Sequence, residues 1–221
     1  MKNPKDDKKT IQIDIRKDLF GANEDAAALN TTLFKKHGIN VIDIMGSVGT
    51  GKTQLIEALC DRLRERYRIL MLAGDLATTI DADRVASHGV DTVQINTGTA
   101  CHLDARMIRV ALRDVDLSSY QAIFIENVGN LICPAGYPLG AAKKVVVVSI
   151  TEGPYMIRKH PLTIKHADVV VINKIDLAEA LEFNIDALEA DIREVDAKLP
   201  FFRVSSKTGE GLDELINGLG F

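Results

Sequence analysis

The segment GSVGTGKT, residues 46–53, most constrains what this chain can fold into. It fits the pattern G-x-x-x-x-G-K-[ST], follows the apolar run VIDIM and precedes the helical pattern TQLIEALCDRL. The glycines allow the backbone to wrap closely, so that successive amides point inward at phosphate oxygens. The start of a helix adds partial positive charge at the same place. Because the order strand, loop, helix is the one this motif requires, the segment predicts a nucleoside triphosphate site.

The whole loop is assigned to nucleotide binding. Lys52 is expected to contact the β- and γ-phosphates, and the hydroxyl of Thr53 is expected to bind Mg²⁺. A glycine-rich turn without a ligand is the alternative interpretation. The nucleotide-binding residues of the loop are Gly46, Ser47, Val48, Gly49, Thr50, Gly51, Lys52 and Thr53.

Apolar, β-branched runs alternate with helical patterns along the rest of the chain. Several runs are apolar throughout, which is typical of parallel strands covered on both faces. The alternation predicts an α/β fold with a doubly wound, mostly parallel sheet of about seven strands and helices on both faces, the P-loop NTPase fold. The expected strands are 40–45, 68–73, 90–95, 122–126, 144–150, 168–174 and 201–205, and the expected helices lie near 53–66, 81–88, 103–113, 155–166, 185–197 and 210–219.

Length and composition indicate one domain. The 221 residues suit a single α/β domain over 37–221, preceded by an extension and a leading helix within residues 1–36. That helix, about 17–36, places Leu19, Ala26, Leu29 and Leu33 on one face, to pack on the sheet or to contact a second subunit. The net charge of −4 gives no general attraction to nucleic acid or membrane. Without an apolar span or signal peptide, and with three cysteines, a cytoplasmic location is expected.

The segment VVVINKIDL, 169–177, indicates guanine as the base. Asp176 can accept hydrogen bonds from guanine N1–H and N2–H₂, donors that adenine does not offer at those places. Asn173 can bind the base or brace the phosphate loop, and the stem of Lys174 can lie along the base. The later segment VSSKTGEG, 204–211, is similar to the loop that supports guanine in GTPases, with Ser205, Ser206 and Lys207 in the supporting positions.

Two more strand ends carry acids. ENVG, 126–129, stands where GTPases have D-x-x-G, so Glu126 is expected to hold Mg²⁺ and Gly129 to sense the γ-phosphate. Asp75 ends the second strand and is a further magnesium or water-positioning group, or else a helix cap. Asn130 follows Gly129 where some GTPases have a water-orienting glutamine, which predicts slow intrinsic hydrolysis. The catalytic set is therefore Lys52, Thr53, Asp75, Glu126 and Gly129.

Cysteine and histidine gather near the same edge. Cys101 and His102 follow the third strand, and Cys133 follows the next one in the sequence. Thiolates and imidazole are good ligands for Zn²⁺ and Ni²⁺, although this spacing is not a standard zinc-finger arrangement. A small buried residue is the alternative for each cysteine, and it is the interpretation for Cys60. A symmetric dimer could supply the three ligands twice around one interface.

Together these motifs resemble the HypB family of hydrogenase nickel-incorporation GTPases. The resemblance runs through GSVGTGKT, AGD, NTGTACHLDA, FIENVGNLICPA, NKIDLA and SSKTGEG, over about residues 38–220. It implies a GTP-hydrolysing metallochaperone that uses GTP, Mg²⁺ and Ni²⁺ or Zn²⁺ and forms a nucleotide- and metal-dependent homodimer. It also implies a nickel-binding co-chaperone and the hydrogenase large subunit as partners, and Cys101, His102 and Cys133 as metal ligands.

The sequence departs from the family at its N-terminus, and three other functions are compatible with some of the motifs. Residues 1–36 lack the cysteine cluster or histidine tract of many bacterial members, so nickel must pass through the site in the GTPase domain. A urease-type accessory GTPase is the nearest rival, but its C-P-H triplet is absent, since Ala135 follows Cys133-Pro134. A P-loop kinase would leave NKID without a role. A non-catalytic module dimerised by structural zinc would bind metal independently of nucleotide.

Overall fold

The computed structural model describes residues 15–75 and 80–221, with side chains described from residue 21 onward and not at residue 80. It contains one sheet of seven strands in the order β3-β2-β4-β1-β5-β6-β7, and every pair is parallel. This confirms the predicted doubly wound sheet. The strands are β1 (Asn40–Met45), β2 (Ile69–Asp75), β3 (Asp91–Asn96), β4 (Ala122–Glu126), β5 (Lys143–Ser149), β6 (Val169–Asn173) and β7 (Phe201–Val204).

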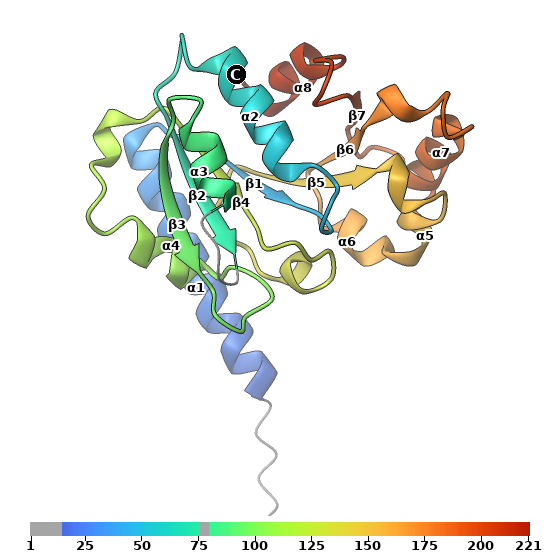
Figure 1. The fold of residues 1–221 in the computed structure, drawn as a ribbon. Coiled ribbons are helices and arrows are strands. Elements are labelled where there is room, and N and C mark those ends of the chain that lie inside the picture. Colours follow the sequence, from blue (N-terminus) through green and yellow to red (C-terminus); the bar gives the residue numbers. More distant parts are fainter. Residues whose placement is uncertain (1–14, 76–79) are drawn as a thin grey trace, which may run out of the picture.

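Helices cover both faces of the sheet (Figure 1). One face packs against α2, α3 and α8, and the other against α1 and α4 on one half and α5, α6 and α7 on the other half. None of the described helices is both long and apolar enough to cross a bilayer. The helices are α1 (Ile15–His37), α2 (Lys52–Leu63), α3 (Ile80–Ala86), α4 (Ala105–Ala111), α5 (Met156–Lys159), α6 (Pro161–Lys165), α7 (Ile185–Val195) and α8 (Leu212–Leu219).

The buried side of α1 differs from the predicted one. Leu29 is 55% exposed, whereas Ala26, Ala27 and Phe34 are buried, so the assignment of Leu29 to the packed face is wrong. The reason lies in Asn30, which is buried because its amide donates to the carbonyls of Ala105 (2.8 Å) and Leu139 (3.0 Å). These bonds turn a polar side of the helix toward α4 and the loop before β5. The side chain of Leu19 lies outside the described residues.

The single helix expected at 155–166 is two short helices. Residue His160 has φ −128° and ψ 48°, and it separates α5 from α6. Pro161 begins α6, and since proline has no backbone N–H, it cannot continue the hydrogen-bond ladder of α5. The predicted start of the fourth helix also shifts, because Asp104 caps α4 through its bond from the Met107 amide (2.8 Å). Cys101 and His102 therefore lie in the loop before α4.

Candidate nucleotide and metal site

The phosphate loop joins the end of β1, the central strand, to the start of α2. Gly49 and Gly51 have φ of 82° and 93°, a region that favours glycine. A Cβ on Gly51 would lie 2.7 Å from the side-chain nitrogen of Asn173, so a larger residue would push the neighbouring loop away. Lys52 is buried, and its ammonium group donates to the carbonyls of Gly46 (3.2 Å) and Ser47 (3.1 Å). The loop thus surrounds one central cation.

The predicted magnesium ligands Thr53 and Glu126 contact each other. The hydroxyl of Thr53 donates to Oε1 of Glu126 at 2.8 Å, and both residues are buried. Oε2 of Glu126 has no hydrogen-bond partner among the described residues. Both side chains line a cleft of about 440 Å³, together with Lys52, Asp75 and Gly129. The structure therefore gathers the whole predicted catalytic set around one cavity.

Burial dominates the electrostatics of this cleft. Burial raises the pKa of Glu126 to about 7, against the opposing effects of the Thr53 hydrogen bond and the charge of Lys52. Burial also lowers the pKa of Lys52, an effect that the charge of Glu126 opposes. Each group is costly to hold in its charged form, so a phosphate beside Lys52 and a cation beside Glu126 would both relieve that cost.

The donor set fits a magnesium-bound triphosphate. Mg²⁺ prefers oxygen ligands, and it is commonly held by one or two protein groups together with phosphates. Thr53 and Glu126 offer a hydroxyl and a carboxylate with one oxygen unused, inside a cleft that the phosphate loop borders. These residues are compatible with the cation and leave the remaining positions to phosphate and water.

The predicted base-binding loops are joined to the phosphate loop by hydrogen bonds. Asn173 donates to the Thr50 carbonyl (2.9 Å) and accepts from the amide (3.1 Å) and hydroxyl (2.9 Å) of Ser206. It therefore braces the phosphate loop, one of the two roles that the sequence left open. The Lys174 ammonium donates to the Gly49 carbonyl at 2.6 Å.

Asp176 is held in place by the serine of the second loop. The hydroxyl of Ser205 donates to Oδ1 of Asp176 at 2.6 Å, and it also accepts from the amide of Thr208 at 3.1 Å. Lys207 is exposed. A carboxylate with one oxygen fixed in this way is oriented in advance for the paired donors of a guanine edge.

The segment after Glu126 runs against the phosphate loop. A Cβ on Gly129 would lie 2.6 Å from Cγ2 of Val48, so a larger residue here would require the exposed Val48 side chain to move. The backbones of Gly46 and Asn130 form an isolated antiparallel bridge. The side-chain oxygen of Asn130 accepts from the amides of Ile132 (2.9 Å) and Cys133 (3.4 Å), which directs it along its own segment.

The three predicted metal ligands lie near one another without forming a closed site. A hydrogen bond between the thiols of Cys101 and Cys133 raises the pKa of Cys101, with burial as the second cause. Cys101 Sγ lies 3.7 Å from Nδ1 of His102, and the His102 ring packs against Tyr137 with centroids 3.9 Å apart. Within 15–75 and 80–221, no three acidic, cysteine or histidine side chains are arranged to hold a metal ion. Cys60 is buried in the core, as predicted.

Two residues of α3 that no sequence motif indicated also line the cleft. Asp81 and Arg84 face the catalytic set, and Arg84 forms an ion pair with Glu57 at 2.8 Å. The only signal in the sequence was a charged face on the expected helix 81–88. That pattern is equally typical of a solvated surface, so the position of the helix was needed to place these groups.

Known proteins resemble this chain over most of its length. A family model described as CobW/HypB/UreG, nucleotide-binding domain, matches residues 40–203. A protein of Methanocaldococcus jannaschii, named probable hydrogenase maturation factor HypB, is 46% identical over 204 residues, which cover 92% of each chain.

Two solved structures have the same fold and substantial sequence identity. The hydrogenase maturation factor HypB from Archaeoglobus fulgidus superposes with a TM-score of 0.83 at 38% identity, over 90% of this chain and 97% of that one. HypB from Helicobacter pylori, solved in complex with nickel, gives a TM-score of 0.84 at 38% identity, over 90% of this chain and 93% of that one.

Proposed function

This chain belongs to the CobW/HypB/UreG family, among the hydrogenase maturation factors HypB, and we propose that it is a GTP-hydrolysing metallochaperone for nickel. It would deliver nickel during maturation of [NiFe]-hydrogenase. One observation carries the proposal: a single segment, 126–136, contacts both candidate sites. Glu126 at its start accepts a hydrogen bond from Thr53 of the nucleotide cleft, and Cys133 further along lies close enough to Cys101 to raise its pKa.

The nucleotide part of the proposal is the conversion of GTP and water to GDP and phosphate. Lys52 would exchange its bonds to loop carbonyls for bonds to phosphate oxygens. Thr53 and Glu126 would hold Mg²⁺, which neutralises charge on the β- and γ-phosphates. Asp75 and Gly129 lie on the same cleft, where Asp75 would position water and Gly129 would contact the γ-phosphate.

Hydrolysis by the isolated chain is proposed to be slow. The amide oxygen of Asn130 already accepts two backbone amides of its own segment, so it is poorly placed to orient an attacking water. A second protomer or another partner would then supply the missing group. This is consistent with the proposed nucleotide-dependent homodimer, formed by the domain at 37–221.

The metal part of the proposal assigns the nickel cargo to Cys101, His102 and Cys133. The Cys133 thiol lies close enough to raise the pKa of Cys101, and thiolate and imidazole suit nickel as well as zinc. Since the described side chains hold no closed group of three, the ligands would complete their arrangement on binding metal or on dimerisation. A nickel-binding co-chaperone and the hydrogenase large subunit are the proposed partners on either side of the transfer.

Nickel titration followed by native mass measurement tests the proposal. The titration is run with GDP and with a non-hydrolysable GTP analogue, and it is repeated on Cys133→Ala. The nickel affinity and the fraction of dimer should differ between the two nucleotide states of the wild type. The difference should disappear in the variant, because the segment would no longer carry a metal ligand.

Other outcomes separate the rival functions. Equal nickel affinity with both nucleotides, in monomer and dimer, would reject coupling between the sites. A dimer that chelation dissociates regardless of nucleotide would instead indicate a structural zinc site. GTP consumption that requires a small-molecule acceptor would indicate a kinase.

A further inference from the structure

A carboxylate lies inside the central strand, where the proposed function does not use it. Asp43 of β1 is 1% exposed, and its neighbours on the same face, Val41 and Met45, are fully buried. A charged group in such a position is costly unless it has partners that compensate it. Burial raises the pKa of Asp43 to about 6, and the charge of Lys144 opposes this effect.

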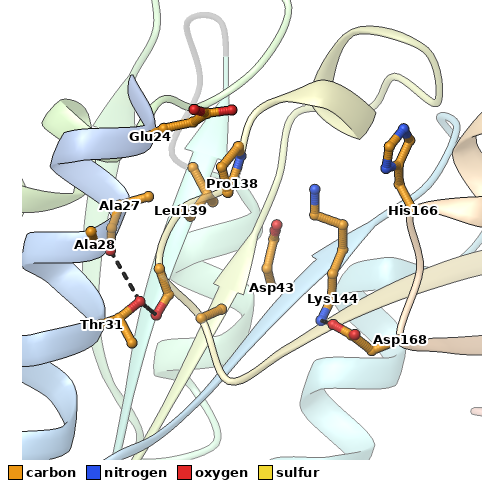
Figure 2. A pocket seen from close by; sticks show the side chains of 12 residues that line it. Glu24, Ala27, Ala28, Thr31, Asp43, Pro138, Leu139, Lys144, His166 and Asp168 are labelled. Carbon is orange, nitrogen blue, oxygen red and sulfur yellow. Dashed lines mark hydrogen bonds between the residues drawn. The ribbon is translucent and has the colours of Figure 1, made fainter. Parts of the chain in front are cut away.

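Figure 2 shows Asp43 beside Lys144, with α1 on one side and His166 and Asp168 on the other. These residues line a cavity of about 420 Å³. Oδ1 of Asp43 accepts from the side-chain amide of Asn127 at 3.2 Å, and Oδ2 is without a partner among the described groups.

Asn127 connects this carboxylate to the segment that contains Cys101 and His102. It is 1% exposed, and it directly follows Glu126, the proposed magnesium ligand. Its side-chain oxygen accepts from the amides of Leu103 and Val128, each at 3.1 Å. Leu103 follows His102 in the chain and is fully buried, so this bond fixes the backbone next to two of the metal ligands.

Lys144 lies beside the same carboxylate, where its charge acts on Asp43 without a direct bond, and it bonds to the turn that follows Cys133. In the sheet register, Lys144 of β5 lies directly opposite Asp43 of β1. Its ammonium group donates to the carbonyls of Ala135 (3.1 Å) and Pro134 (3.5 Å). These carbonyls belong to the two residues that follow Cys133. Lys144 therefore fixes the backbone of the turn that carries Cys133.

We propose that Asp43, Asn127 and Lys144 form a polar clamp that positions the two metal-binding segments relative to each other and to Glu126. Asn127 holds the segment of Cys101 and His102, Lys144 holds the segment of Cys133, and Asp43 stands between the two. None of the three clamp residues is among the proposed metal or nucleotide ligands, although Asn127 lines the nucleotide cleft; they are positioning residues. The inference rests on the proposed nickel site, whose ligands they would keep in register.

The size of the effect follows from the role of outer groups in metal sites. Residues that orient ligands without binding the metal typically change its affinity by about 10- to 100-fold when removed. Loss of the Lys144 ammonium should therefore weaken nickel binding by about tenfold, because the Cys133 turn would be released from its anchor. The nucleotide site should keep its affinity, since its contacts do not involve Lys144.

The test compares Lys144→Met with Lys144→Arg and Lys143→Met. Lys144→Met keeps the aliphatic stem and removes the donor, while Lys144→Arg keeps a charged donor. Lys143 is the matched control, because strand alternation places it on the opposite face of β5 with the same charge. Nickel affinity is read from thiolate-to-nickel charge-transfer absorbance, and affinity for a GTP analogue is measured in parallel.

A second measurement needs no metal. Oxidised glutathione is expected to oxidise the two thiols to a Cys101–Cys133 disulfide, and it is itself reduced to two glutathione molecules. The rate reports how closely the segments hold the thiols, so Lys144→Met should slow it by about fivefold, while Lys143→Met should match the wild type. A GTP-analogue affinity within about twofold of the wild type establishes that each variant is folded.

The outcomes distinguish this inference from the proposed function. A nickel affinity and a disulfide rate unchanged in Lys144→Met would overturn the clamp and leave the proposed function standing. An equal loss in Lys143→Met would overturn it as well, because general charge would then explain the effect. No charge-transfer band in the wild type would overturn the proposed nickel site, and with it the clamp's role.

Discussion

The nucleotide cleft and the metal-binding segments lie at the same edge of the sheet and are built in opposite ways. In the cleft, Lys52, Thr53 and Asn173 each hold a defined hydrogen bond to a neighbouring element or loop. Among the proposed metal ligands, Cys101 lies 3.7 Å from His102, yet the described side chains form no closed metal group. One region is assembled in advance, and the other is left to be completed.

The difference fits the two proposed tasks. Phosphoryl transfer depends on fixed donors, because catalysis comes almost entirely from positioning and electrostatics. A cargo site must bind a metal and also release it, so at least one ligand has to change position between the two events. The protein thus has fixed hydrogen bonds in the nucleotide cleft, while the three proposed metal ligands are not yet arranged as a closed site.

Lys52→Ala should give the largest effect, because it removes a rigid contact from the cleft. We expect single-turnover GTP hydrolysis to fall by about 10²- to 10³-fold, as for loss of one preorganised charge stabiliser. Nickel affinity without nucleotide should remain at the wild-type level. Lys143→Ala serves as the charge-matched control, and a rate loss below about threefold in Lys52→Ala would contradict the assignment.

Cys133→Ala should weaken nickel binding and leave the nucleotide cleft unchanged. Loss of a direct ligand is expected to weaken nickel binding by at least about 100-fold, the upper end of what loss of an outer group costs. Affinity for a GTP analogue should stay the same in the metal-free protein. Cys60→Ala is the control, since Cys60 is buried in the core and should affect stability only. Equal nickel binding by both variants would exclude Cys133 as a ligand.

The pH dependence of the free energy of unfolding tests Asp43, which lies in the strand between the two regions. Because Asp43 has a pKa of about 6 in the folded chain and a lower one when unfolded, its stabilising contribution is complete at low pH. That contribution is lost as the pH rises from about 4 to about 6, and the loss amounts to about 3 kcal/mol. Asp43→Asn should remove this dependence.

Urea unfolding of wild type and Asp43→Asn at about pH 4 and about pH 8 measures that change. The variant's free energy of unfolding relative to the wild type should rise by about 3 kcal/mol between the two pH values. Glu24 is exposed and lines the same cavity, so Glu24→Gln controls for general charge. Parallel curves for wild type and Asp43→Asn would contradict a raised pKa.

Asp176→Asn should give the smallest of these effects and act on the base alone. The variant loses a charged acceptor for guanine N1–H and N2–H₂, and a bond to a charged group is worth about 1.5 to 3 kcal/mol. We expect affinity for GDP to fall by about 30-fold, with nickel affinity unchanged. Isothermal titration with GDP and ADP checks it, and an equal loss for both nucleotides would argue against a role in choosing guanine.

Local patterns in the sequence predicted the fold and the nucleotide loops well. The ends of each strand were predicted to within one or two residues. This was possible because a parallel strand covered on both faces has an uninterrupted apolar sequence. The order of the motifs along the chain also placed Asn173 and Ser205 at the same sheet edge, although the bonds that they make there were not predicted. Such features need only neighbouring residues to be recognised.

Features that depend on distant partners were not predictable. The asparagine Asn30 makes α1 bury a polar side, and its acceptors Ala105 and Leu139 lie far along the chain. Asp43 is recognisable as an acid within the apolar run VIDIM. The neighbouring sequence, however, does not indicate that Asn127 is its hydrogen-bond partner. That Cys101, His102 and Cys133 do not form a closed metal site likewise depends on how their side chains are placed, which their spacing in the sequence does not determine.

The folded-back ammonium of Lys52 has a consequence for how a nucleotide enters. Since the carbonyls of Gly46 and Ser47 already hold this cation, an arriving phosphate replaces existing partners and finds the charge at its destination. Nucleotide binding then replaces at least part of the two hydrogen bonds that the ammonium group already makes. The two carbonyls act as built-in competitors, so the measured affinity for nucleotide is the difference between two sets of bonds to one nitrogen.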